Sequence, residues 1–309
     1  MKILMFGRGV IATVYGWALE QAGHEVEFFV RPGRAAEYGP TVNLDIIDGR
    51  RVPWGRRHVE QWPARYREAF DTEETYDLIV LSVSHAQLAA AAEFLAPHVG
   101  TATVLVLGNV WSELDEAIAP IPTGQVVWGF PGAGGGVDHA GVVRGGLLPV
   151  VVLGREANDR YTSVRRAIVD AGIRVSEQSD IRGWLWIHFI ADAGMHAQGV
   201  RLGSLSKMIG APNAMRQALL ATRELLPLLA IRGVDLRLHR TSTRLYLAPS
   251  RVVAAIMSAA ISSIPLARRS LEAHDDPLAV EPRAVLRDVV AEARRQNFSA
   301  PRVESALTS

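Results

Sequence analysis

The stretch that decides the fold lies at the start of the chain, where residues 2–30 are KILMFGRGVIATVYGWALEQAGHEVEFFV. A short apolar run at residues 2–6 ends in a glycine, a helical pattern follows over residues 10–22, and a second apolar run covers residues 25–30. Strand, glycine turn, helix and strand in this order predict a βαβ unit whose two strands are parallel.

A glycine motif lies between the first run and the helix, where Gly7, Gly9 and Ala12 fit the pattern G-x-G-x-x-A. The first glycine permits a tight turn, the second lets the backbone approach a pyrophosphate, and a small third residue lets helix and strand pack closely. The helix N-terminus adds N–H groups and partial positive charge. A glycine turn without a ligand is the alternative, but the motif stands in the context it requires. The expected cofactor-binding residues here are Gly7, Arg8, Gly9, Val10, Ile11 and Ala12.

The residues after the second run indicate which nicotinamide dinucleotide binds. An Asp or Glu at this point would bind the ribose 2′-hydroxyl, but the sequence has Arg31 with Arg34 close behind. A guanidinium suits a 2′-phosphate. Two solvated arginines in a turn are the alternative. We therefore expect NADP(H) as the cofactor.

The rest of the chain divides into two regions with different patterns of apolar residues. Up to about residue 178, β-like runs alternate with helical patterns, which predicts a parallel sheet covered by helices. Beyond it only helical periodicity remains, and a turn is expected at Asp275 and Asp276. The expected fold class is α/β, with a Rossmann-type dinucleotide-binding domain at residues 1–178 and an all-α domain at 179–309. The expected strands are 42–47 with the segment around residue 52 as a hairpin, 76–83, 103–107, 126–130, 142–152 and 173–175; the helices are 86–95, 111–118, 161–171, 180–200, 212–232, 248–264 and 282–296; residues 132–136 are expected to form a flexible loop.

Composition excludes several classes of protein. The chain has 309 residues, of which 49% are apolar, and no cysteine, which argues against global disorder, thiolate nucleophiles and cysteine-ligated zinc. Lys and Arg number 33 and Asp and Glu 32, so we expect no nucleic-acid partner. Glycines interrupt the N-terminal apolar run and serines and a proline interrupt residues 252–267, so we expect neither a signal peptide nor a membrane span. The expected location is the cytoplasm.

In the order of its motifs along nearly the full length, the chain resembles the ketopantoate reductase (2-dehydropantoate 2-reductase) family. The opening KILMFGRGVIA is similar to the family's first strand and glycine loop, and LGN at residues 107–109 is similar to its strand followed by an asparagine. The chain also has VEPR at residues 280–283 and QNFSAPRVE at residues 296–304, which resemble the family's last helix and final turn. The resemblance implies a Rossmann domain plus a helical domain. It also implies that Arg31 contacts the 2′-phosphate, that Asn109 lies near nicotinamide and substrate, and that Glu281 lies beside the substrate.

The departures from the family pattern fall on polar positions. His188 replaces the catalytic lysine of the family's W-x-K-x-x-x-N-x-x-x-N helix, and Asp192 and His196 replace its two asparagines. Ser84 stands at the cofactor-side lysine of the family's K-x-x-Q segment, while Gln87 is retained. By resemblance, Ser84, Gln87 and Asn109 are expected on the cofactor and His196 with Glu281 on the substrate.

His188 is the expected general acid, because reduction of a ketone needs a hydride from the nicotinamide and a proton for the developing alkoxide. Asp192 follows one helical turn later and would orient the imidazole or keep it protonated. Asn109 would donate to the substrate oxygen or hold the cofactor carboxamide. Glu281 would bind a substrate hydroxyl or relay a proton. A metal site is the other interpretation of these types, but His196 lies about 12 Å along the helix axis from His188, too far for one ion. Ordinary polar contacts are a third interpretation, and no metal is expected.

The sequence therefore predicts an NADPH-dependent reductase of a small 2-oxo acid or related ketone, resembling 2-dehydropantoate 2-reductase. An NADP-dependent dehydrogenase or imine reductase acting on another substrate is one alternative, and a catalytically inactive NADP-binding protein is another. The expected partner is a small-molecule substrate. A homodimer is a further expectation from the apolar helical region.

Overall fold

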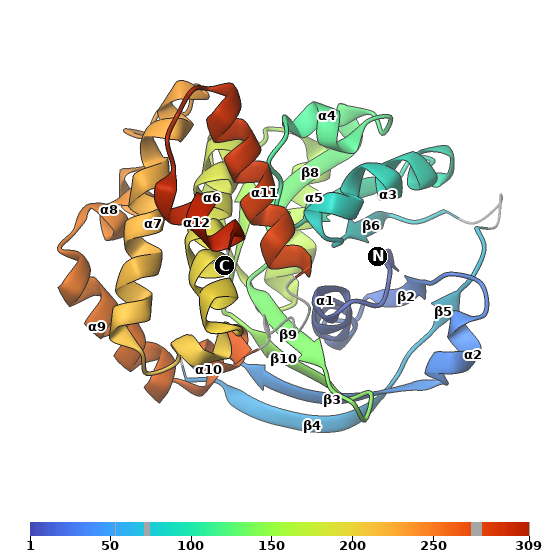
Figure 1. Cartoon of the computed structure of the whole chain (residues 1–309). Coiled ribbons are helices and arrows are strands. Elements are labelled where there is room, and N and C mark those ends of the chain that lie inside the picture. Colours follow the sequence, from blue (N-terminus) through green and yellow to red (C-terminus); the bar gives the residue numbers. More distant parts are fainter. Residues whose placement is uncertain (53, 71–74, 273–279, 309) are drawn as a thin grey trace. The chain divides into compact units, whose positions relative to one another are not determined.

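Eight strands form one sheet in the N-terminal part of the computed structural model (Figure 1). Its order is β12-β11-β8-β7-β6-β1-β2-β5, and every neighbouring pair is parallel except β8 with β11. The chain leaves β1 toward β2 on one side and returns to β6 on the other, so the strand order reverses at β1. The strands are β1 (Lys2–Phe6), β2 (Glu25–Phe29), β5 (Tyr66–Arg67), β6 (Leu78–Leu81), β7 (Thr103–Leu107), β8 (Val126–Phe130), β11 (Val150–Gly154) and β12 (Arg174–Gln178).

Helices connect these strands as the alternating pattern predicts, but the helix expected over residues 111–118 begins only at Leu114. The structure describes residues 1–52, 54–70, 75–272 and 280–308, so the turn expected at Asp275 and Asp276 lies outside it. The first unit contains α1 (Val10–Gln21), α2 (Arg34–Tyr38), α3 (Leu88–Leu95), α4 (Leu114–Ile118) and α5 (Asp159–Asp170), with short 3-10 turns η1 (His85–Gln87), η2 (Ala96–His98) and η3 (Thr123–Gln125).

The chain divides into two compact units. Unit 1 comprises Met1–Gly108 and Ser112–Ile181, and unit 2 comprises Asn109–Trp111 and Arg182–Ser309. Three residues after β7 thus belong with the C-terminal helices. The division into two domains at residues 1–178 and 179–309 stays a prediction.

A second sheet was not expected as a separate layer. It has the order β4-β3-β10-β9, from β3 (Thr41–Asp48), β4 (Arg56–Pro63), β9 (Ala133–Val137) and β10 (Val143–Leu147). A hairpin forms here as expected, with β3 paired antiparallel to β4 from Thr41 opposite Pro63 to Asp48 opposite Arg56. The expected position of its second strand was wrong, because that strand begins at Arg56 and does not include residue 52. The prediction of a flexible loop at residues 132–136 was wrong, because most of that segment is β9, paired antiparallel with β10.

The glycines of this sheet have a packing reason, since α1 lies directly on β9 and β10 (Figure 1). A Cβ on Gly135 would lie 2.5 Å from Cγ1 of Val10, and one on Gly145 would lie 2.8 Å from Cγ2 of Val14. On the opposite side of α1, a Cβ on Gly16 would lie 2.9 Å from the Phe28 ring of β2. The middle of α1 is therefore buried between two sheets, with a glycine at each close approach.

Unit 2 is helical throughout the residues described after 181, as the periodicity predicts. In its core Gly194 of α6 lies so close to α7 that a Cβ would meet the Ala218 carbonyl at 2.6 Å. No single described helix is long and apolar enough to cross a bilayer; α8 and α9 pass that test only as a pair bent by 105°. The helices are α6 (Ile181–Leu202), α7 (Pro212–Ile231), α8 (Arg240–Leu247), α9 (Ser250–Ser263), α10 (Pro265–Glu272), α11 (Val280–Arg295) and α12 (Pro301–Leu307), with a 3-10 turn η4 (Ser206–Met208).

The contact between α1 and the second sheet predicts a steric penalty at Gly135. We expect Gly135→Ala to lower the free energy of unfolding by about 1–3 kcal/mol, because the added methyl group overpacks the interface. Gly124→Ala is the matched control, since no atom lies within 4 Å of its Cβ position. Urea unfolding followed by circular dichroism measures both variants. Equal stability of the two would contradict the packing argument.

Candidate active site

The glycine loop connects β1 to α1 at the point where the strand order reverses. Gly7 has φ +87°, in the left-handed region that favours glycine, and its N–H donates to the Phe29 carbonyl at 2.9 Å. Gly9 is the N-cap of α1, and no side chain of the described residues caps this end of the helix. Apart from the neighbours in sequence, no described atom lies within 4 Å of the Cβ position of either glycine. The loop thus offers an open approach to the first N–H groups of α1, which have no partner within the helix.

Arginine side chains gather beside this loop. The guanidinium of Arg8 lies 4.3 Å from the centre of the Tyr38 ring, and that of Arg34 lies 4.8 Å from it. Arg34 also donates to the Tyr38 hydroxyl at 3.0 Å, while Arg31 is exposed at the turn before α2. The sequence indicated the three arginines; it did not indicate Tyr38, which holds two of them.

Ser84 and Gln87 follow β6, which is the neighbour of β1 in the sheet. The Ser84 hydroxyl donates to the Gln87 side-chain oxygen at 3.0 Å. Because the carboxyl ends of parallel strands meet at one edge of a sheet, this pair lies on the same edge as the glycine loop.

In unit 2 the structure brings together three of the predicted residues. The amide Nδ2 of Asn109 donates to Oδ2 of Asp192 at 2.6 Å. Oδ1 of the same carboxylate lies 3.6 Å from Nε2 of His188, and the Trp184 ring stacks on the imidazole at 5.3 Å. A carboxylate only accepts hydrogen bonds, so the amide NH₂ must face Asp192. Oδ1 of Asn109 is buried and accepts no hydrogen bond within the described part of the chain.

Three further polar residues of unit 2 bear on the predicted site. Tyr246 of α8 packs against the core, and burial, together with the charge of Asp192, raises the pKa of its phenol to about 12. His196 is buried one turn beyond Asp192, and Glu281 is exposed in the first turn of α11. The substrate roles of His196 and Glu281 stay predictions.

Sequence reasoning missed Trp184 and Tyr246 as parts of the cluster. Trp184 stacks on the imidazole of His188, whereas Trp186, two residues later, is buried in the core. Among the residues described, no group of three His, Cys, Asp or Glu side chains is arranged to hold a metal ion.

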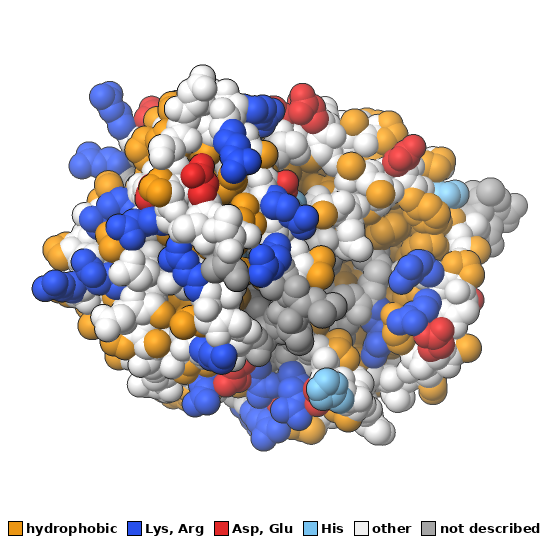
Figure 2. Space-filling model, viewed as in Figure 1, with side chains coloured by type: hydrophobic (Ala, Val, Ile, Leu, Met, Phe, Trp, Pro, Cys, Tyr) orange, Lys and Arg blue, Asp and Glu red, His pale blue; other side chains and the backbone are white. Residues whose placement is uncertain are grey.

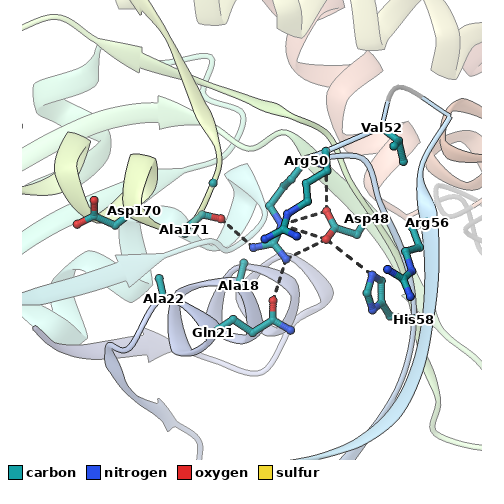
Figure 3. Close-up of a pocket in the computed structure, with 12 residues that line it drawn as sticks. Ala18, Gln21, Ala22, Asp48, Arg50, Val52, Arg56, His58, Asp170 and Ala171 are labelled. Atoms are coloured by element: carbon teal, nitrogen blue, oxygen red, sulfur yellow. Dashed lines mark hydrogen bonds and ion pairs between the residues drawn. The ribbon is translucent and has the colours of Figure 1, made fainter.

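A cavity of about 450 Å³ opens elsewhere in unit 1, at the carboxyl end of α1 (Figure 3). It lies one helix length, about 18 Å, from the glycine loop. Arg50 extends across it, donating to Asp48 at 2.9 Å, to the Ala171 carbonyl at 2.8 Å and to the Gln21 side chain at 2.8 Å (Figure 3). One guanidinium thereby links the second sheet to the ends of α1 and α5, which is a structural task.

Charged side chains of both signs are spread over the face drawn in Figure 2. Figure 2 shows Lys and Arg side chains interspersed with apolar, acidic and uncharged ones on the face drawn, without one continuous basic area. The local gathering of arginines at the glycine loop therefore depends on Tyr38 and the turn before α2 rather than on a basic protein.

The glycine loop on a mostly parallel sheet, followed by a helical second unit, defines a protein of the Rossmann-type dinucleotide-binding class. The chain belongs to the ketopantoate reductase family: residues 3–155, about half of its length, match the family model described as ketopantoate reductase PanE/ApbA. This family and its solved relatives are oxidoreductases.

Solved structures share the fold over the whole chain. A D-mandelate dehydrogenase in a ternary structure with NADH and anilino(oxo)acetate has a TM-score of 0.72 at 15% identity, covering 100% of this chain and 96% of that one. The 2-dehydropantoate 2-reductase from Geobacter metallireducens GS-15 has 0.70 at 17%, covering 100% and 98%. A dimeric ketopantoate reductase from Staphylococcus aureus has 0.63 at 15%, also covering 100% and 98%. At these identities the likeness shows the fold.

The Arg50–Asp48 pair predicts a loss of stability in acid. Burial raises the pKa of the Asp48 carboxyl, but the hydrogen bonds and charge of Arg50 outweigh burial and hold it below its ordinary value. A carboxyl with a lower pKa in the folded state stabilises the fold above the unfolded pKa of about 4 and loses this contribution as pH falls. We expect Asp48→Asn to cost about 3 kcal/mol near pH 7, because it leaves Arg50 buried without its counterion.

Urea unfolding of the native chain and of Asp48→Asn at about pH 7, 5 and 3 measures this difference. We expect the difference in free energy of unfolding between the native chain and Asp48→Asn to become smaller below about pH 5. Glu93→Gln, at an exposed position on α3, is the control and should leave stability unchanged at each pH. If the difference in free energy of unfolding is the same at every pH, the ion pair is not its cause.

Proposed function

We propose that this protein is an NADPH-dependent reductase of a small 2-oxo acid or a related ketone. The observation that carries the proposal is the cluster of Asn109, Asp192 and His188, in which one carboxylate accepts a hydrogen bond from the amide and lies 3.6 Å from the imidazole. Two kinds of relative support the substrate class. One is a 2-dehydropantoate 2-reductase, and the other is a dehydrogenase solved with anilino(oxo)acetate.

The residues of unit 1 fit a dinucleotide. The open approach at Gly7 and Gly9 suits a pyrophosphate on the N-terminus of α1. Arg31 and Arg34, with Arg8 held on Tyr38, suit the 2′-phosphate of NADP(H), because planar guanidinium groups bind phosphate oxygens through paired donors. Ser84 and Gln87 would line the same edge of the sheet. A nicotinamide, when bound, supplies or accepts the hydride.

The residues of unit 2 supply the rest of the chemistry. His188 would donate the proton that the developing alkoxide requires, and Asp192, 3.6 Å from Nε2, would orient the imidazole. The planes of Trp184 and His188 differ by 6°, so stacking fixes the imidazole plane. The buried Oδ1 of Asn109 would accept a hydrogen bond from a carboxamide N–H or a substrate hydroxyl. His196 and Glu281 would complete the substrate contacts.

One relative favours a second function in the same site. The dehydrogenase solved with NADH shares this fold, so oxidation of a 2-hydroxy acid with NAD is the alternative. Assays with NADPH and NADH, and with 2-oxo acids and 2-hydroxy acids, separate the two. NADPH binding without turnover on such a panel would favour an inactive binding protein.

The proposal extends to assembly and location. A homodimer is supported by the Staphylococcus aureus relative that is described as dimeric. The proposed location is the cytoplasm, where the NADPH that the reaction consumes is available.

The arginine set predicts a cofactor preference that a single substitution alters. We expect Arg31→Ala to raise KM for NADPH about tenfold or more, because a charge-assisted hydrogen bond to the 2′-phosphate is lost, and to change KM for NADH less than twofold. Arg174→Ala, on the exposed surface of β12, is the control. Steady-state assays with both cofactors test this, and an equal rise for both would refute phosphate recognition.

The proposed role of His188 predicts that its substitution lowers kcat without weakening the binding of NADPH. We expect His188→Gln to lower kcat by about 100-fold or more, because general acid catalysis is removed, while Kd for NADPH stays within twofold. Asp192→Asn should lower kcat less, since the imidazole remains. His139→Gln, in an exposed loop, is the control. Wild-type hydride transfer in His188→Gln, measured by stopped-flow on the true substrate, would remove His188 from the reaction.

A further inference from the structure

Asn109 stands on a short segment that is held inside the helical unit. The segment follows β7, yet Asn109–Trp111 groups with the helices of unit 2. Val110 is 2% exposed and Trp111 is 8% exposed. The Trp111 ring stacks on Phe189 of α6 at 4.9 Å. Because only one residue separates Asn109 from Trp111, the anchoring of Trp111 limits where the Asn109 amide can lie.

Arg232, the residue after α7, holds this anchor. Its guanidinium carbon lies 4.0 Å from the centre of the Trp111 ring and 3.6 Å from that of Trp186. Its Nη2 donates to the backbone carbonyl of Trp111 at 2.7 Å. The rings fix the plane of the guanidinium, and the hydrogen bond fixes the direction of the Trp111 carbonyl.

A buried carboxylate balances the charge of Arg232. The side chain of Arg232 is 10% exposed, and Nε lies 3.5 Å from Oε1 of Glu292, whose side chain is 4% exposed. Gln296 donates to the same carboxylate oxygen at 3.1 Å, and Arg295 pairs with the carboxylate as well. A buried charge pair is weak evidence for stability alone, since well-packed apolar residues often replace one without loss. An apolar side chain would fill the space between the two tryptophans, but it would not donate to the Trp111 carbonyl.

We propose that Arg232 is a positioning residue, which acts on the reaction by holding the 109–111 segment so that the Asn109 amide meets Asp192 beside His188. This inference rests on the proposed function of that cluster. Arg232 touches neither substrate nor cofactor in this role. A misplacement of about 1 Å in a reacting geometry lowers rates by about 100-fold, so a residue two steps from the chemistry can control kcat.

The kinetic test compares Arg232→Met with Arg232→Lys. We expect Arg232→Met to lower kcat by about 10–100-fold while KM for NADPH stays within twofold. Arg232→Lys should recover part of the loss, because lysine donates to the Trp111 carbonyl but lacks the planar group that stacks on the rings. Arg201→Met is the matched control, since Arg201 of α6 donates to the Arg302 carbonyl on the surface of the same unit. Unchanged kcat in folded Arg232→Met would overturn the proposal.

A double-mutant cycle tests whether Arg232 acts through Asn109. We expect Arg232→Met to lower kcat less than twofold further once Asn109→Ala is present, because the amide to be positioned is gone. Losses that multiply in the double variant would show a separate, merely structural effect. If Arg232→Met does not fold, Arg232→Lys takes its place in the cycle.

A structural readout separates this inference from the proposed activity. In a crystal structure of Arg232→Met or Arg232→Lys, we expect Nδ2 of Asn109 to lie beyond hydrogen-bond distance of Asp192. An unmoved amide would overturn the positioning role even if the enzyme is active. Absence of turnover in the native chain would refute the proposed function, and the position of the amide would still decide the role of Arg232.

Discussion

The burial of α1 between two sheets is the constraint on which the rest of unit 1 depends. Gly16 lets the helix approach the parallel sheet, and Gly135 and Gly145 let the second sheet approach from the other side. A helix held this closely has a fixed axis, so the position of its N-terminus at the glycine loop is fixed as well. The opposite end is fastened by Arg50, which reaches α1, α5 and the second sheet at once. The position of the glycine loop is therefore set by packing on both faces of one helix.

Unit 2 fixes the positions of its polar side chains by different means. Its cluster depends on the long helix α6, which carries Trp184, His188 and Asp192 at successive turns of one face. Asn109 comes from a segment far away in the chain and is brought to that face by the anchoring of Trp111. The polar contacts thus stand on an apolar and aromatic base, where stacking and burial leave the amide and the imidazole few alternative orientations. The proposed reaction would need such rigidity, because small misplacements of reacting groups lower rates strongly.

Much of the first sheet could be predicted from the sequence because its signals are local. The strand, glycine loop and helix of residues 2–22 follow from periodicity and two glycines, as do β7 and β8 from their continuous apolar runs. The second sheet could not be predicted, since the pairing of β10 with β3 joins distant segments and the glycines of β9 carry no alternating pattern. In the candidate site, Asn109, Asp192 and His188 followed from a family pattern. Tyr38, Tyr246 and Arg232 act through tertiary contacts that no spacing indicates.

The passage of the chain through Asn109–Trp111 has a consequence for dissection of the protein. A fragment ending at residue 181 would carry Val110 and Trp111 without the helical core that covers them, and would expose apolar surface that favours aggregation. The complementary fragment would lack the indole that stacks on Phe189 and would leave a cavity beside Trp186 and Arg232. A single cut of the chain therefore does not divide the two units, so exchange of either unit between relatives must carry these three residues with the helices.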